Sequence, residues 1–198
     1  MSTIQLYSGG YIDLLSPRPE DIHLIDIAHG LSNLCRFTGH TSKFYSVAQH
    51  SVLVSLLIED PDLQHAALLH DAAEAYLGDV SSPLKRLLPE YQLIEKRFEE
   101  AIAARFKFTF DDLAKVKRAD IRALATEKRD LLASHRLDAH EWRFLNDKTI
   151  KPHPEIIQPQ SPEIAHQRFI ARYSEIRACD RHELGIGQYS WGVFSVRP

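Results

Sequence analysis

The sequence predicts a mainly helical protein of a single domain, with a small β-hairpin at its N-terminus. Apolar residues recur at helical spacing along most of the chain, prolines and glycines separate the periodic segments, and strand-like alternation occurs only near the N-terminus. The 198 residues are enough for one hydrophobic core, and an apolar content of 44% is ordinary for a globular protein. We therefore treat residues 1–198 as one helical bundle.

The first part of the chain predicts the hairpin and two helices. Residues 4–15 alternate around Ser8-Gly9-Gly10, and glycines in such a position favour a tight turn. Apolar spacing predicts helices over residues 22–34 and 46–58. The polar residues 36–44 between them predict a loop.

The rest of the chain predicts further helices and one long loop. A helix over 62–77 ends at Gly78, and Ser81-Ser82-Pro83 predicts the cap and first-turn proline of a short helix to Leu88. Residues 146–162 contain four prolines and predict a loop. Longer helices are predicted over residues 90–106, 111–135 and 163–179.

Composition excludes several classes of partner. A formal net charge of −3 offers no extended basic surface for a long nucleic acid. The chain has no run of about 18 apolar residues and lacks the order of a secretion signal, so we expect a cytoplasmic protein without a membrane partner. Two cysteines are too few for a disulfide framework. The expected partner is a small molecule, and assembly into a homo-oligomer is left open.

Three predicted helices carry polar residues inside their apolar stripes. An isolated histidine in such a stripe is usually a satisfied core residue, and an isolated aspartate usually pairs with an arginine. A buried carboxylate without a partner costs on the order of several kcal/mol, so it must be paired or bind a metal. Glu74 and Glu127 stand in these stripes as well, and one shared site accounts together for the two histidines and two aspartates, His50, His70, Asp71 and Asp120.

Two histidines and two aspartates suit a divalent transition metal. Four protein ligands leave room for water in an octahedral shell, and water acidified by the metal is the hydroxide source that phosphate ester hydrolysis needs. The ligand types do not choose among cobalt, manganese, zinc, nickel, iron and magnesium. A second ion accompanying a nucleoside triphosphate is left open.

The metal-ligand pattern resembles the signature of the HD-domain superfamily, which implies a helical HD-domain bundle. The chain is similar to the branch that contains YfdR- and YfbR-like 5′-deoxynucleotidases and phage deoxyadenosine-triphosphate hydrolases. The similarity covers about residues 20–135 and leaves the last helix and tail, 163–198, outside. The segments that carry it are Leu31–Phe37, Phe44–His50, His70–Asp79 and Ala119-Asp120.

The resemblance implies roles for the acidic site residues. Glu74 matches an acid that contacts metal-bound water and the attacking oxygen, and Asp79 matches a second acid that activates water or protonates the leaving oxygen. Two carboxylates in different surroundings can divide acid and base work in this way. The implied metal ligands are His50, His70, Asp71 and Asp120.

The resemblance also implies substrate contacts. Arg36 matches an arginine that binds phosphate, and Phe37 stands where relatives have a tryptophan beside the deoxyribose. Lys85 and Lys117 match lysines that reach further phosphates, although both are equally compatible with solvated helix positions. Pro83, which lacks a backbone donor, is expected to help exclude a 2′-hydroxyl if its loop closes over the sugar.

The expected function is metal-dependent hydrolysis of small deoxynucleotides, either as a 5′-monophosphatase or as a deoxynucleoside triphosphate triphosphohydrolase. One alternative is a phosphodiesterase acting on cyclic or signalling nucleotides. Another is a regulatory module that binds a nucleotide without catalysis. Glu74 and Asp79 argue against the last alternative, because binding alone does not need both acids.

Overall fold

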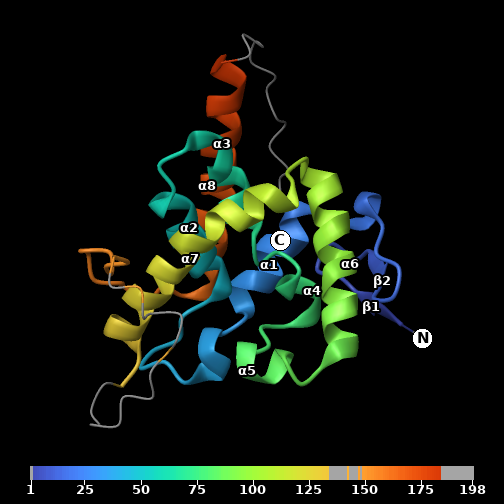
Figure 1. The fold of residues 1–198 in the computed structure, drawn as a ribbon. Coiled ribbons are helices and arrows are strands. Elements are labelled where there is room, and N and C mark those ends of the chain that lie inside the picture. The colour runs from blue at the N-terminus through green and yellow to red at the C-terminus, as the bar shows by residue number, and fades with distance from the viewer. Residues whose placement is uncertain (1, 134–141, 143–146, 148, 184–198) are drawn as a thin grey trace.

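The computed structural model describes residues 2–133, 142, 147 and 149–183. These residues form a helical bundle with one two-stranded antiparallel sheet at the N-terminus (Figure 1), so the predicted fold class is confirmed. None of the described helices is long and apolar enough to cross a membrane. The predicted tail from residue 185 lies outside the described residues.

The hairpin consists of β1 (Thr3–Gln5) and β2 (Tyr11–Asp13), with Ile4 paired to Ile12. Gly9 has a φ of 88°, a value that costs glycine little and that allows the turn. The backbone N–H of Ser8 donates to the Asp26 carboxylate at 2.7 Å. This bond ties the turn to the first helix, and Ile12 enters the core.

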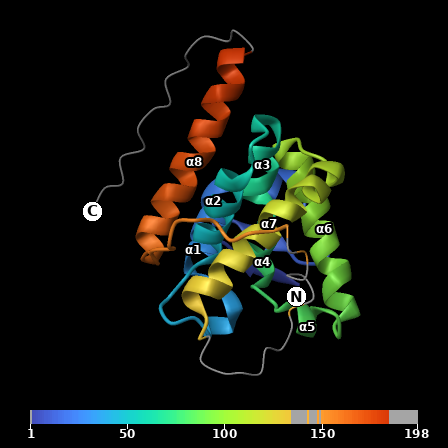
Figure 2. The ribbon, with the colours of Figure 1, turned by 60° about the vertical axis from the view of Figure 1, so that its left-hand side comes forward.

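The centre of the bundle is α2 (Val47–Leu57), which packs against α1 (Leu24–Asn33) and α3 (Pro61–Leu69). It also packs against α7 (Phe110–Leu131) and α8 (Pro162–Glu183), which lie on opposite sides of it in Figure 2. The α2 helix begins where the Ser46 side chain accepts a hydrogen bond from the Gln49 N–H. Its central position explains why a polar residue on α2 is enclosed by other helices.

One predicted helix is wrong as a continuous element. Residues 62–77 instead form the end of α3, a turn over 70–73 and the short helix α4 (Glu74–Leu77). Within the turn, the Ala72 N–H bonds to the carbonyl three residues earlier at 3.0 Å, as in a 3₁₀ turn. The α-helical turn therefore changes to the tighter 3₁₀ turn immediately after the last residue of α3.

The break in this helix has a local cause. The His70 Nδ1 atom lies 2.8 Å from the Ala67 carbonyl oxygen, the acceptor that the Asp71 N–H would use in a continuous α-helix. Adjacent residues of a regular helix point about 100° apart. The tighter turn allows both His70 and Asp71 to face the same cluster, described below.

Close packing fixes the position of this turn. A Cβ atom at Gly30 of α1 would lie only 2.9 Å from the Ala75 carbonyl oxygen of α4, so the glycine permits the contact between the two helices. The Glu74 side chain is buried beside this contact. We infer that Gly30 sets the depth at which α4 enters the bundle.

The remaining elements differ from prediction mainly at their ends. The short helix is α5 (Ser82–Lys85), with Ser81 at its N-cap and proline in its first turn as predicted, although the Ser81 side chain makes no capping hydrogen bond. It is followed by α6 (Pro89–Phe106). The α7 helix stops at Leu131, and its start is fixed by a capping box between Thr109 and Asp112.

The predicted proline-rich loop is not helical over its described residues 149–161. The Gln49 side chain of α2 anchors this segment by donating to the Gln158 carbonyl at 2.8 Å and accepting from the Gln160 N–H at 3.0 Å. These bonds hold the loop against the helix that carries His50.

Candidate metal centre

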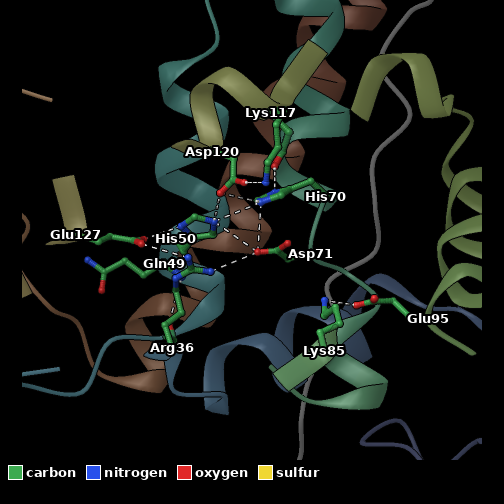
Figure 3. Close-up of polar contacts among 12 residues, drawn as sticks. Arg36, Gln49, His50, His70, Asp71, Lys85, Glu95, Lys117, Asp120 and Glu127 are labelled. Atoms are coloured by element: carbon green, nitrogen blue, oxygen red, sulfur yellow. Dashed lines mark hydrogen bonds and ion pairs between the residues drawn. The ribbon is translucent and has the colours of Figure 1, made fainter. Parts of the chain in front are cut away.

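Side chains from α2, α7 and the turn after α3 converge on one cluster (Figure 3). The Nε2 atom of His50 lies 3.3 Å from Nε2 of His70, 3.5 Å from Oδ2 of Asp71 and 3.4 Å from Oδ1 of Asp120. The Nε2 atom of His70 lies 3.2 Å from Oδ2 of Asp71 and 4.0 Å from Oδ1 of Asp120.

These separations fit atoms that share one metal ion. Ligand atoms about 2.1 Å from an ion lie about 3.0 Å apart at an octahedral angle and about 3.4 Å apart at a tetrahedral angle. His50, His70 and Asp120 form a group that could hold a metal, with their ligand atoms within 4.8 Å of one another. Asp71 adds a further oxygen to the same cluster.

Hydrogen bonds orient both imidazole rings. The Nδ1 atom of His50 lies 2.6 Å from Oε1 of Glu127, and Nδ1 of His70 lies 2.8 Å from the Ala67 carbonyl oxygen. Because both partners are acceptors, each Nδ1 carries the proton, and each Nε2 is the atom left for a metal. The two rings thus present their free nitrogen atoms to the same point.

Glu127 completes this arrangement, although the sequence assigned it no role. It is fully buried on α7, seven residues after Asp120, and its second oxygen accepts from Arg36 Nη2 at 3.2 Å. Burial raises its pKa, but the charges of Arg36 and His50 lower the pKa more, so Glu127 is ionised. The signal in the sequence was a second carboxylate in the stripe that carries Asp120.

The charge of the cluster keeps its aspartates ionised. Burial raises the pKa of Asp71 and Asp120. Their interactions with the two histidines have the larger, opposite effect, and both pKa values lie well below the ordinary range of a carboxyl group. Arg36 also lowers the pKa of Asp71, with Nη1 at 3.4 Å from Oδ2. The carboxylates are therefore in the form that binds a cation.

The pKa of His50 predicts a pH-dependent metal affinity. Burial and the Arg36 charge lower this pKa, but the Glu127 charge and hydrogen bonds to Asp120 and Glu127 raise it to about 9. Below that pH, the metal-free protein holds a proton that the ion must displace. Metal affinity should therefore rise about tenfold per pH unit up to about pH 9, and level off above it.

A competition titration with a chromogenic chelator, repeated from pH 6.5 upward, measures this dependence. The same linkage predicts that the protonated His50 stabilises the metal-free fold below the ordinary pKa of 6.5, and that this stabilisation is lost as the pH rises through about 9. An affinity independent of pH over this interval would contradict the assignment of His50.

Glu74 lies buried at the start of α4, and its Oε2 atom has no hydrogen-bond partner among the described residues. Burial raises its pKa well above the ordinary value, and the charges of Asp71 and Asp79 raise it further. Asp79 is half-buried, and its pKa is also raised, chiefly by burial. Both acids lie within electrostatic reach of the cluster, because the charge of Asp71 raises the pKa of each.

Two lysines lie near the cluster and its neighbouring acids. The Lys117 Nζ atom donates to Oδ2 of Asp120 at 2.6 Å, although 64% of the lysine side chain remains exposed. Lys85 donates to Glu95 at 2.5 Å (Figure 3). Burial lowers the pKa of Lys85, but this bond and the charges of Glu95, Glu74 and Asp71 raise it more. Lys85 therefore retains its positive charge.

The predicted sugar contacts occupy different surroundings. Phe37 follows Arg36 in a left-handed backbone conformation, with a φ of 54°, and its ring lies under the Arg36 guanidinium. The ring centroid is 6.1 Å from that of Trp142. A positive φ is uncommon for a bulky residue and tends to mark functional segments. Pro83, in contrast, lies exposed in α5.

Comparison with known proteins yields two uncharacterized relatives. The chain is 40% identical over 182 residues to the uncharacterized protein YfdR of Escherichia coli K12, an alignment covering 90% of this chain and 99% of YfdR. It is 39% identical over 146 residues to an uncharacterized protein of Rhodobacter capsulatus, covering 69% of this chain and 71% of that protein. No family model matches the chain. The chain belongs to the same protein family as YfdR.

Proposed function

We propose that this protein is a metal-dependent phosphohydrolase of the HD-domain superfamily that acts on small deoxynucleotides. The observation that carries the proposal is the convergence of His50, His70, Asp71 and Asp120 at separations suited to one divalent ion. A divalent ion at such a site supplies Lewis-acid stabilisation of phosphate oxygens and lowers the pKa of water.

The acids next to the cluster support catalysis over binding alone. The Oε2 atom of Glu74 has no hydrogen-bond partner among the described residues and is therefore available to orient water. The raised pKa of Asp79 suits it to protonate the leaving oxygen. A site that only binds a nucleotide gains nothing from two acids whose charged forms are disfavoured by burial.

Positive charges near the cluster suit a compact phosphate group. Lys117 lies beside Asp120, and Lys85 lies within electrostatic reach of Glu74 and Asp71. This local charge contrasts with the net charge of −3 of the chain. We therefore propose free nucleotides as substrates, because long polymers are bound through extended basic surfaces.

The test is hydrolysis by metal-stripped protein to which single divalent ions are returned. Deoxynucleoside mono- and triphosphates are supplied, and phosphate, pyrophosphate and triphosphate are resolved as products. We expect metal-dependent release of phosphate from monophosphates or of triphosphate from triphosphates. Cleavage of only cyclic or signalling nucleotides would favour the phosphodiesterase alternative. Binding without turnover would favour the regulatory module, and efficient cleavage of long DNA or RNA would refute the proposed substrate class.

Phe37 carries the prediction that deoxyribose is preferred over ribose. An apolar ring against the 2′ carbon leaves an added hydroxyl without a partner, which costs about 1–3 kcal/mol, or roughly 10- to 150-fold in kcat/KM. Phe37→Ala should therefore reduce the deoxy preference, measured with matched ribo- and deoxyribonucleotides. Phe44→Ala, which changes an exposed aromatic residue, is the control. Equal efficiencies in the unmodified protein would refute the selectivity, and an unchanged preference in Phe37→Ala would remove Phe37 as its cause.

A further inference from the structure

A buried ion pair connects two of the candidate metal ligands without belonging to the ligand set. Arg36 Nη2 donates to Oε2 of Glu127 at 3.2 Å, and Arg36 Nη1 donates to Oδ2 of Asp71 at 3.4 Å. The other oxygen of Glu127 lies 2.6 Å from Nδ1 of His50. A continuous chain of polar contacts thus runs from Asp71 through Arg36 and Glu127 to His50 (Figure 3).

The backbone fixes the arginine at this position. The Arg36 N–H donates to the Tyr45 carbonyl at 2.9 Å, and the neighbouring residues Cys35 and Ser46 form a β-bridge. Ser46 is also the N-cap of α2, the helix that carries His50. The segment that places the guanidinium is therefore the segment that fixes the start of the histidine-bearing helix.

A phosphate-binding role alone does not account for these contacts. Only 12% of the Arg36 side chain is exposed, and its two terminal nitrogen atoms already face carboxylates. Stability alone does not account for them either, because replacing a buried ion pair by well-packed apolar residues is often neutral or stabilising. What the pair does provide is a fixed acceptor for His50 and a fixed donor for Asp71.

We propose that Arg36 and Glu127 form a clamp that positions two metal ligands, with Glu127 holding the His50 ring and Arg36 holding both Glu127 and Asp71. The clamp deepens the proposed function and rests on its metal site. Glu127 acts as the carboxylate that orients a ligating imidazole and increases its basicity, and loss of such a partner lowers metal affinity by roughly 10- to 100-fold. Arg36 is then a positioning residue.

Zinc affinity of the purified protein, measured by competition with a chelator, is the first test. Arg36→Met and Glu127→Leu should each weaken zinc binding by roughly 10- to 100-fold. The matched control is Arg172→Met, because Arg172 is similarly buried, with 14% of its side chain exposed, and contacts α2 through Ser55. The control should bind zinc as the unmodified protein does. Unchanged affinity in both clamp variants, with only KM for nucleotide raised in Arg36→Met, would overturn the proposal.

The protonated Nδ1 of His50 supplies a spectroscopic test that needs no destabilising substitution. In the zinc-loaded unmodified protein, proton–nitrogen NMR should show a slowly exchanging Nδ1–H resonance for His50, because this proton is buried and hydrogen-bonded. Glu127→Gln keeps an oxygen acceptor and should keep the resonance, whereas Glu127→Leu should lose it. Absence of the resonance in the unmodified protein, or its persistence in Glu127→Leu, would overturn the clamp.

The outcomes separate this proposal from the proposed function. A protein that binds zinc with the expected His50 resonance but hydrolyses no nucleotide would refute the function and leave the clamp intact. A protein that hydrolyses nucleotides but keeps its zinc affinity in both Arg36→Met and Glu127→Leu would refute the clamp alone.

Discussion

Asp120→Ala is expected to abolish metal-dependent hydrolysis. Oδ1 of Asp120 lies 3.4 Å from Nε2 of His50 and 4.0 Å from Nε2 of His70, so the substitution removes one oxygen from the cluster. It also leaves the Lys117 ammonium group, 2.6 Å from the other oxygen, without its partner. Because Asp120 is itself one of the candidate ligands, the loss should exceed the roughly 10- to 100-fold effect typical of residues that only support ligands.

The measurement is phosphate release by metal-stripped protein titrated with a divalent ion, together with the affinity for that ion. Asp111→Ala is the matched control because Asp111 is an exposed residue of the same helix, α7. It should retain both activity and metal affinity. Turnover retained in Asp120→Ala would contradict the assignment of the metal centre and, with it, the proposed reaction.

Glu74→Gln is expected to lower kcat by about 10² or more, the usual contribution of a positioned acid or base. The carboxyl group is buried, and Oε2 has no partner among the described residues, so it is available to a water molecule or a substrate atom. The amide has nearly the same shape but accepts no proton. Substrate binding should therefore be affected less than catalysis.

Steady-state kinetics with a saturating metal concentration separate the two effects. Glu100→Gln, an exposed change of the same kind on α6, is the control and should leave both constants unchanged. If Glu74→Gln raises KM and leaves kcat unchanged, the residue serves binding, and the role proposed for it is wrong.

The elements that could be predicted from the sequence are those whose signals are local. The α3 helix starts at Pro61, one residue before the predicted start, because the Asp60 side chain accepts from the Asp62 N–H. The hairpin follows from the glycine turn and the alternation on either side of it. The Thr109 cap starts α7 at Phe110, one residue before the predicted start. In each case, residues adjacent in the chain supply the hydrogen bonds.

The break at residues 70–73 could not be predicted in this way. Apolar spacing continues from Leu63 to Leu77, so periodicity predicts one helix. The turn depends instead on the Ala67 carbonyl accepting from the His70 ring and on the close packing of Gly30 against α4. Both depend on where the cluster lies in three dimensions.

The pattern of apolar and polar residues indicates which side chains need polar partners in the folded protein. His50, His70 and Asp120 stand in apolar stripes and Asp71 lies next to one, and the energetic cost of an unpaired buried charge made a shared site the simplest explanation. The choice of partner for each side chain could not be predicted in this way, because hydrogen bonding depends on distances between helices that a linear pattern does not contain. In the folded protein, Glu127 lies within hydrogen-bond distance of the His50 ring, and Arg36 donates to two carboxylates at the cluster.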